Sequence, residues 1–533
     1  MKPINTTIST FKNLIEADYV YVDKTEYIYN MVREPFGQYF FSRPRRFGKS
    51  LTVSILEAIF SGEKELFKGL YIYGTDYSFE EYPIIHLDFG RSDSTNKKKL
   101  EDWINRELRE IADKNEISIK GSSPALLFGE LIKGLYNKYG KGVVILIDEY
   151  DRPITNNVEE GKRVHEIRIM MEAFYQMING YESMERFVFL TGITRLSQVS
   201  IFSKLNNLDD ISRKTDYAGM VGYTNDELDR YFAEYLDDGA KKTGCTKEEL
   251  KSKLAYWYDG FKFTFKDEKV YNPVSIGQFF NNNCEYRNYW YATATPTMLV
   301  EQAKKQKLSV EDIENAFFTE VSYSSFDVTT LSGDELNTQM LIQLLFQSGY
   351  LTFGERIEGI PTTAYKLVYP NYEVQMSFEM ELASIYVGQG VQEINSVSIM
   401  IQQAAAIGNV AKMMDLLKSL IAGIPYNIQV KHEKYYQSMI YLIFKMCGMD
   451  VESECVTNIG RIDAVMRAAN NIYIIECKLD KSPEKAIEQI YDMKYAQKYL
   501  IEKEKGKSLV GIGIDFSYAD GIKNIRDYKE IEL

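Results

Sequence analysis

Cysteine, histidine and proline are all scarce in this chain of 533 residues, which contains five Cys, three His and 12 Pro. The cysteines are odd in number and form no CxxC pair, so we expect neither a disulfide framework nor a structural zinc site, and a reducing compartment is favoured. The histidines form no HxxxH pair, which argues against a zinc hydrolase. Low proline content and the lack of low-complexity segments argue against long disordered spacers.

Long apolar runs are also missing from the sequence. No segment approaches the roughly 20 apolar residues that a membrane helix needs, and residues 1–24 contain no apolar stretch long enough for a signal peptide. We therefore expect a cytoplasmic protein without a membrane partner. Hydrophobic residues make up 45% and charged residues 26% of the chain, as in ordinary globular proteins. The length is too great for one core and predicts several domains.

Positive charge is in deficit, because 63 Lys and Arg face 76 Asp and Glu, giving a net charge of −13. A nucleic-acid-binding protein is often basic, so this balance counts mildly against one. The excess of acid lies before residue 426, and the remainder of the chain is close to neutral. Because a phosphate responds to the local electric field, local basic grooves remain compatible with the overall charge.

Apolar segments alternate with helical patterns in the first 220 residues. The sequence predicts strands at 38–42, 82–89, 142–147 and 186–191, and helices at 50–60, 100–116, 124–139 and 163–182. Such alternation is typical of a parallel sheet with right-handed crossovers. We therefore expect the α/β fold class, with a P-loop NTPase sheet in a domain at residues 1–220.

The remainder of the chain divides into three expected segments. Residues 221–335 read as a helical lid or connector, which begins with a capping box at Thr224 and Glu227 and includes an aromatic packed turn, YWYDGFKF, at 256–263. Residues 336–425 read as a helix followed by a hairpin, which outlines a winged-helix unit, although a plain connector domain fits equally well. Residues 426–533 form the last domain, for which we expect an α/β restriction-endonuclease-like fold.

The segment RPRRFGKS at 43–50 resembles a phosphate-binding loop. It fits the pattern GxxxxGK[ST] except that Arg43 replaces the first glycine. Gly48 lets the backbone approach a phosphate closely, and the following helix would supply N–H donors at its positive end. Lys49 would bind the β- and γ-phosphates, the Ser50 hydroxyl would bind Mg²⁺, and Arg46 adds charge that suits a polyphosphate. The expected cofactors are ATP and Mg²⁺.

A second element of the nucleotide site follows about 100 residues later. The apolar segment 143–147 ends in Asp148 and Glu149, so Asp148 would hold Mg²⁺ and Glu149 would polarise the attacking water. The alternative is a strand whose exposed end carries acids by chance. After the next strand, Thr191 or Arg195 could sense the γ-phosphate. Arg195 and Arg213 are candidate arginine fingers, within the chain or across a homo-oligomer, but each could simply pair with a local carboxylate.

Two strands near the C-terminus carry a second group of charged residues. The segments RIDAVMR at 461–467 and IYIIECK at 472–478 flank turn-prone asparagines, which favours an antiparallel hairpin. A turn centred between positions 469 and 470 places Asp463 directly opposite Glu476, on one face of the sheet. Lys478 lies two residues further along the strand and shares that face.

Two opposed carboxylates repel each other unless a cation lies between them. Mg²⁺ takes one or two protein carboxylates and keeps bound waters, so the sequence predicts a metal site at Asp463 and Glu476. Lys478 could orient a water or stabilise charge on a phosphate. Helices on either side could bring Glu433 and Gln489 to the same place. The alternative is a surface salt bridge between one of the acids and Lys478.

Together these motifs resemble a family of prokaryotic proteins that join an AAA-ATPase-like domain to a C-terminal PD-(D/E)XK nuclease-superfamily domain. The resemblance rests on segments at 21–31, 42–51, 145–151, 189–197, 344–352 and 460–478. It implies ATP binding and a nuclease-type site made of Glu433, Asp463, Glu476, Lys478 and Gln489. Arg43 in the phosphate loop resembles the family's own pattern, whereas Ile462 stands where the superfamily name has proline.

The leading hypothesis from the sequence is an ATP-regulated, Mg²⁺-dependent nuclease that acts on DNA, with RNA as the less favoured substrate. An alternative of another class is an ATP-driven switch or scaffold that binds nucleic acid or partners without cutting. A third is an ATPase whose output is self-assembly. The acidic overall charge favours the switch, and the complete set of Asp463, Glu476 and Lys478 favours the nuclease.

Overall fold

The computed structural model describes residues 1–157, 161–195, 207–294, 297–306, 308, 310–324, 337–359, 361–387, 391–423, 432–447, 449–456, 461–518 and 523–533. The chain forms two compact units. The first consists of residues 1–299 and 315–374, and the second of residues 300–314 and 375–533. The predicted boundaries at 335/336 and 425/426 lie outside the described residues, and the four-part division stays a prediction.

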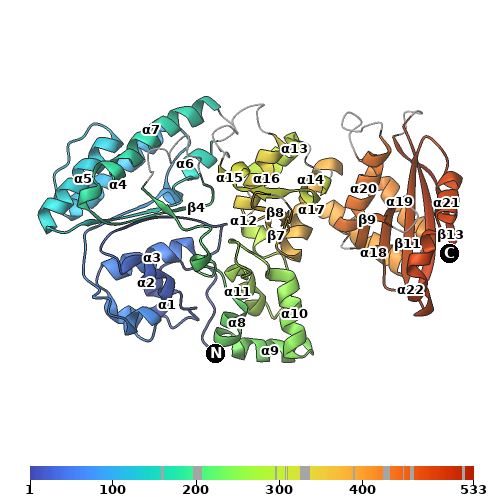
Figure 1. The fold of residues 1–533 in the computed structure, drawn as a ribbon, viewed down its shortest axis with the longest axis horizontal. Helices are drawn as coiled ribbons and strands as arrows, with labels where there is room; N and C mark the ends of the chain where they lie inside the picture. The colour runs from blue at the N-terminus through green and yellow to red at the C-terminus, as the bar shows by residue number, and fades with distance from the viewer. Residues whose placement is uncertain are drawn as a thin grey trace. The chain divides into compact units, whose positions relative to one another are not determined.

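The first unit begins with an α/β domain, drawn in blue to teal in Figure 1. Its strands are β1 (Gly37–Ser42), β2 (Ile84–Asp88), β3 (Val143–Asp148), β4 (Glu185–Gly192) and β5 (Asp209–Asp210). Its α-helices are α1 (Phe11–Glu16), α2 (Thr25–Val32), α3 (Lys49–Phe60), α4 (Lys97–Lys114), α5 (Pro124–Tyr139), α6 (Arg152–Thr155) and α7 (Gly161–Gly180). The four strands predicted from apolar runs are therefore confirmed, with small differences at their ends.

The five strands form one parallel sheet in the order β2-β3-β4-β1-β5. Helices α4, α5 and α7 lie on one side of it and α1 to α3 on the other (Figure 1). Strands β3 and β4 are buried along their whole length, which explains their nearly unbroken apolar sequences. Because the strands are parallel, their carboxyl ends meet at one edge, where ligands bind in open α/β sheets.

Helices dominate the rest of the first unit. They are α8 (Asn225–Tyr231), α9 (Ala233–Thr243), α10 (Lys247–Tyr258), α11 (Pro273–Asn281), α12 (Tyr291–Ala294), α15 (Glu320–Ser324) and α16 (Thr338–Gln347). The capping box of Thr224 and Glu227 is present at the start of α8. A small antiparallel sheet has the order β6-β8-β7, with β6 (Phe317–Thr319), β7 (Thr352–Arg356) and β8 (Ala364–Val368). The expected sequence of a helix followed by a hairpin is thus observed.

The second unit contains a five-stranded mixed sheet in the order β13-β12-β11-β10-β9. The strands are β9 (Asp450–Val456), β10 (Arg461–Arg467), β11 (Asn471–Leu479), β12 (Ser508–Ser517) and β13 (Asn524–Glu532). The helices that lie wholly in this unit are α14 (Val310–Glu314), α18 (Val391–Ala406), α19 (Val410–Ala422), α20 (Glu433–Met446), α21 (Pro483–Asp492) and α22 (Leu500–Glu504). Two more helices, α13 (Thr297–Lys305) and α17 (Tyr372–Val387), begin in the first unit and end in the second.

Both faces of this second sheet are covered by helices (Figure 1). On one face, α18, α19 and α20 pack on Tyr473, Ile475 and Cys477 in a large apolar cluster. On the other face, α21 packs on Ile472 and Ile474 in a smaller cluster. The alternation along β11 therefore directs its even-numbered residues, including positions 476 and 478, to the side covered by α21.

No helix in the described part of the chain is both long and apolar enough to span a membrane.

Candidate nucleotide and metal sites

The phosphate loop joins β1 to α3 at the carboxyl edge of the first sheet. Arg46 and Gly48 have positive φ angles of 65° and 101°, so the backbone turns sharply before the helix begins at Lys49. Glycine adopts such a conformation without the steric cost that a side chain brings. Turns of this kind can direct successive N–H groups toward an anion, and the start of α3 adds its own donors.

Lys49 is buried, and its Nζ donates a hydrogen bond to the carbonyl of Pro44 at 2.9 Å. Burial lowers the pKa of this ammonium group, although the nearby carboxylates of Asp148, Glu149 and Asp151 oppose the shift. The lysine thus lies between the loop backbone and the acids of the sheet edge. A γ-phosphate would offer this ammonium a stronger acceptor than a carbonyl.

Asp148 ends β3 and is also buried. Burial raises the pKa of its carboxyl, while a hydrogen bond from Ser50 and the charge of Lys49 oppose that rise. The structure therefore brings together the two residues expected to hold Mg²⁺, Ser50 and Asp148. Asp88, the register partner of Asp148 at the end of β2, lies close enough to raise the same pKa.

Glu149 has an unusual backbone conformation, with φ at 51°. Its N–H donates to the Asp148 carboxylate at 2.9 Å, and its own carboxylate forms an ion pair with Arg152. Non-glycine residues adopt positive φ infrequently and at some cost in energy. The chain accepts that cost beside the phosphate loop, at the position expected for the residue that polarises water.

Asp151, which the sequence reasoning missed, holds the segment after β4. Its carboxylate accepts hydrogen bonds from the N–H groups of Ile193 and Thr194 at 3.1 and 2.7 Å and from the Thr194 hydroxyl at 2.6 Å. Thr191, by contrast, is fully buried and donates its hydroxyl to the Phe41 carbonyl at 2.7 Å. This geometry does not support the sensing role expected of Thr191, because its hydroxyl links two strands of the sheet.

The two candidate arginine fingers both have local carboxylate partners. Arg195 pairs with Asp210 at 3.1 Å, and Arg213 pairs with Glu320 at 2.6 Å. The Arg213 guanidinium also lies 4.1 Å from the centre of the Tyr323 ring. These contacts favour the alternative in which each arginine pairs locally.

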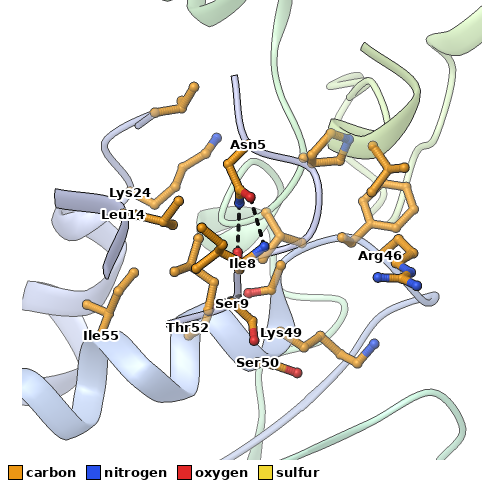
Figure 2. A pocket seen from close by; sticks show the side chains of 18 of the residues that line it. Asn5, Ile8, Ser9, Leu14, Lys24, Arg46, Lys49, Ser50, Thr52 and Ile55 are labelled. Atoms are coloured by element: carbon orange, nitrogen blue, oxygen red, sulfur yellow. Dashed lines mark hydrogen bonds between the residues drawn. The ribbon is translucent and has the colours of Figure 1, made fainter. Parts of the chain in front are cut away.

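A cavity of about 480 Å³ opens beside the phosphate loop. Residues 45–52 of the loop and α3 line it, together with residues 5–9, 20–22, 220–223 and both Glu149 and Arg152. In Figure 2, Arg46 lies at the right and Lys49 and Ser50 lie near the bottom, whereas Leu14, Lys24 and Ile55 lie toward the left. One end of the cavity therefore carries the cationic side chains of the loop, and the other combines apolar side chains with Lys24, which is paired with Glu227. The size of the cavity suits a nucleotide.

Arg43, the departure from the phosphate-loop pattern, is a buried structural residue. Its guanidinium lies between the rings of Phe41 and Phe263, 4.4 and 4.5 Å from their centres, and donates to the Ser212 carbonyl at 2.5 Å. Burial lowers the pKa of Arg43 to about 9. The side chain therefore points into the fold and away from the place where a phosphate would bind.

The C-terminal hairpin has the predicted register. Ala464 pairs with Ile475, and the pairing continues in step to Arg467 with Ile472. The N–H of Ala468 donates to the Asn471 carbonyl at 2.8 Å, which closes the turn. Asp463 and Glu476 lie directly beyond the pair of Ala464 and Ile475, at the end of the hairpin away from the turn. The Asp463 carboxylate accepts the N–H of Cys477 at 2.7 Å.

Glu476 is almost completely buried, with 1% of its surface exposed. Burial and the charge of Asp463 raise its pKa to about 7, although Lys478 opposes the rise. Burial also raises the pKa of Asp463, while the hydrogen bond from Cys477 and the charge of Lys478 oppose that shift. One oxygen of Glu476 accepts from the Lys478 Nζ at 2.9 Å, and the other, Oε2, is buried without a hydrogen-bond partner.

An unpaired carboxylate oxygen in a buried position is costly. Glu476 Oε2 has the chemistry of an Mg²⁺ ligand, since this ion binds carboxylate oxygens directly. Lys478 lies on the same face as Glu476, and its three charged neighbours, Glu476, Asp463 and Glu433, keep its pKa raised although burial acts to lower it. The donor set therefore fits a divalent cation beside a lysine.

The two remaining predicted residues take different positions. Glu433, the first residue of α20, accepts from the Leu479 N–H and from Lys481 Nζ, both at 3.3 Å, and its charge acts on Asp463. Gln489 on α21 donates its side-chain amide to the Tyr495 hydroxyl at 3.2 Å. Glu433 thus lies near the carboxylate pair, whereas the side-chain amide of Gln489 bonds to Tyr495, on which the charges of that pair act.

Gln437 and Tyr495 are neighbours of the pair that the sequence reasoning missed. A side-chain hydrogen bond from Gln437 acts to lower the pKa of Asp463. The Tyr495 hydroxyl donates to the Arg461 carbonyl at 2.6 Å, and burial raises the pKa of this buried tyrosine, with smaller contributions from Glu476 and Asp463. Gln437 follows Glu433 by one helical turn, so the shared helix face could have revealed it.

No group of three or more His, Cys, Asp or Glu side chains arranged to hold a metal occurs among the residues that the structure describes. A site at Asp463 and Glu476, or at Ser50 and Asp148, would therefore rely on two side chains and additional oxygen ligands. Mg²⁺ usually binds proteins in this way, because it retains several of its waters.

The fold and these two groups of residues define the class of the protein: a P-loop-like α/β domain precedes a nuclease-like sheet domain. Residues 5–202 match the family described as "Predicted AAA-ATPase", and residues 431–524 match the "PD-(D/E)XK nuclease superfamily". The chain is 33% identical over 527 residues to the "Uncharacterized protein in vnfD 5'region" of Azotobacter chroococcum mcd 1, covering 97% of this chain and 96% of that protein. The chain belongs to this family of AAA-ATPase-like proteins with a C-terminal PD-(D/E)XK nuclease-superfamily domain.

Proposed function

We propose that this protein is an ATP-regulated, Mg²⁺-dependent nuclease that cleaves DNA. The observation that carries the proposal is the pair of Asp463, which is partly buried, and Glu476, which is buried and whose Oε2 lacks a hydrogen-bond partner beside Lys478. Buried carboxylate oxygens usually have hydrogen-bond partners, and here the unpaired oxygen belongs to an acid that has a second acid and a lysine beside it. An oxygen left unpaired at a charged site is typical of a metal ligand or a catalytic group.

Within this proposal, Asp463 and Glu476 hold the metal ion, and Lys478 stabilises the negative charge that develops on the cleaved phosphate. Bound Mg²⁺ would supply an acidified water and a positive charge next to the scissile phosphate. The hydrogen bond from the Cys477 N–H fixes one oxygen of Asp463. Glu433 adds negative charge at the mouth of the site and pairs with Lys481, which is half-exposed and suited to a phosphate of the substrate.

At the other site, Lys49 and the N–H groups of the phosphate loop bind the phosphates of ATP. Ser50 and Asp148 are the proposed ligands of the nucleotide's Mg²⁺, and Glu149 orients the attacking water. For Glu149 to act, its ion pair with Arg152 must open, because a carboxylate held by a guanidinium is a poor base. ATP binding without rapid hydrolysis is therefore compatible with the observed geometry.

The test of cutting is a plasmid-nicking assay with the full chain and Mg²⁺, with and without ATP. We expect nicking by the wild type, a loss of at least a hundredfold in Glu476→Ala, and a smaller loss in Glu433→Ala. Glu379→Ala is a matched control, since Glu379 is another buried acid of the second unit. Equal inactivity of wild type and Glu476→Ala on DNA and RNA would favour a switch or scaffold that binds without cutting.

The test of the nucleotide site is titration calorimetry with ATP and Mg²⁺. Lys49→Ala removes the ammonium group at the phosphates, and we expect it to abolish measurable binding. Lys24→Ala is the comparison, because Lys24 lines the same cavity but pairs with Glu227. Unchanged ATP affinity in Lys49→Ala would contradict the phosphate role. Nicking by Lys49→Ala that no longer responds to ATP would establish the regulatory link.

A further inference from the structure

Phe261 and Phe263, at the end of the aromatic segment 256–263, pack against the phosphate loop. Phe47, a buried residue of the loop, makes edge-to-face contacts with Phe261 and Phe263, with ring centres 4.8 and 5.1 Å apart. Gly349, with φ at 86°, lies so close to the loop that an added Cβ would approach the Pro44 ring to 2.5 Å. Residues more than 200 positions away in the sequence thus form one wall of the loop.

Trp290 adds a directed contact to this wall. Its indole ring is buried, lies 5.7 Å from the Phe261 ring, and donates through Nε1 to the Arg45 carbonyl at 3.0 Å. In a planar trans peptide the carbonyl of one residue and the N–H of the next point in opposite directions. The hydrogen bond from Trp290 therefore fixes the direction of the Arg46 N–H, within the part of the loop that lines the cavity.

Glu373 holds Trp290 in turn. One oxygen of its carboxylate accepts the backbone N–H of Trp290 at 2.5 Å, and the other accepts the Ser275 hydroxyl at 2.8 Å. Glu373 is buried, and burial raises its pKa to about 7 although these hydrogen bonds oppose the rise. Burying this acid is unfavourable by itself, and its hydrogen bond holds the Trp290 backbone in one place.

We propose that Trp290 and Glu373 are positioning residues of the nucleotide site: they hold the peptide between Arg45 and Arg46 in the orientation that receives a polyphosphate. This inference rests on the proposed ATP binding and deepens it. Neither residue lines the cavity, so both act through the loop backbone. Their effect should therefore depend on the phosphates of the ligand and not on its base.

The first experiment compares Trp290→Phe with Trp257→Phe in the full chain. Trp290→Phe keeps an aromatic ring, though a smaller one, and removes the N–H donor, whereas Trp257 packs on Tyr286 and Tyr372. We expect ATP affinity to fall about fivefold in Trp290→Phe, as the loss of one hydrogen bond implies, and to stay unchanged in Trp257→Phe. Adenosine, which lacks phosphates, should bind both variants as it binds the wild type.

The second experiment asks whether a conservative change at Glu373 restores binding. Glu373→Ala removes both acceptors, while Glu373→Gln keeps one, so ATP affinity should fall in the alanine variant and recover at least partly in the glutamine variant. Thermal melting of every variant separates a loss of folding from a loss of positioning.

The outcomes distinguish this inference from the function on which it rests. A wild-type chain that does not bind ATP overturns the proposed function itself. A wild type that binds ATP, with Trp290→Phe binding it equally well, overturns the positioning role alone. Equal weakening of ATP and adenosine in a folded Trp290→Phe variant would also overturn it, because the effect would not then act through the phosphates.

Discussion

Glu476 offers the sharpest test of the physical reasoning, because its charge links metal binding, pH and stability. Its pKa is raised from 4.5 to about 7 by burial and by Asp463. Such a difference corresponds to about 3 kcal/mol. The folded chain holds this proton more tightly than the unfolded chain, so folding takes up a proton between pH about 4.5 and about 7. The free energy of unfolding of the second unit should therefore fall as pH rises through that window.

Glu379 provides a matched control within the same unit. It is buried on α17, and burial raises its pKa to about 7 as well, although Gln375 and Lys445 oppose the rise. The free energy of unfolding should therefore fall less between pH 5 and pH 8 in Glu476→Gln and in Glu379→Gln than in the wild type. Only Glu476→Gln should also abolish the response to Mg²⁺.

The assay is hydrogen exchange of the β11 amides in the full chain, followed in denaturant at pH 5 and pH 8, with EDTA or Mg²⁺. At a Mg²⁺ concentration 100 times the dissociation constant, a ligand stabilises the folded state by about 2.7 kcal/mol. We expect this gain at pH 8 in the wild type and in Glu379→Gln. If Mg²⁺ protects Glu476→Gln as much as the wild type, Glu476 is not a metal ligand. If the stability of Glu476→Gln depends on pH as strongly as that of the wild type, the argument from burial is wrong.

Two further predictions concern residues whose roles the sequence did not reveal. Tyr495→Phe removes the hydroxyl that joins Gln489 to the Arg461 carbonyl. This variant should destabilise the second unit by about 1 kcal/mol and reduce nicking several-fold. The exposed Tyr491 should tolerate the same change. Arg43→Gly restores the usual first glycine of the phosphate loop. It should nevertheless lower the free energy of unfolding by about 3 kcal/mol, because it removes buried charged hydrogen bonds and ring contacts. A melting temperature equal to or above that of the wild type would contradict this prediction.

The sequence predicted best those features that depend on local periodicity. The strands of the first sheet followed from apolar runs such as 143–147, which are buried on both faces. The hairpin register followed from the turn at 469–470 and from the alternation of side chains, and the pairing of Ala464 with Ile475 confirms it. Both arguments use neighbours in sequence, where the physics of a strand or a turn acts directly.

Features that depend on distant parts of the chain could not be predicted in this way. The hydroxyl of Thr191 donates to Phe41, and Arg43 is held by Phe263, because the sheet order and the aromatic segment bring these residues together. Tyr495 joins Gln489 of α21 to the Arg461 carbonyl of β10, a link between elements that only the packed fold creates. Residue type alone does not show which of several polar groups will find a partner once the elements have packed.

The two candidate sites share one electrostatic design despite their different folds. Asp148 and Glu476 are each a buried acid near the end of a strand, with a pKa raised by burial, and each lies near a lysine, Lys49 or Lys478. A single lysine opposes these shifts without cancelling them, so each acid still favours its neutral form more than a solvated carboxylate does. A divalent cation adds the positive charge that is missing and also competes with the proton for the same oxygen. Metal affinity at both sites should therefore rise with pH while the metal-free protein becomes less stable, a combination that a simple salt bridge would not produce.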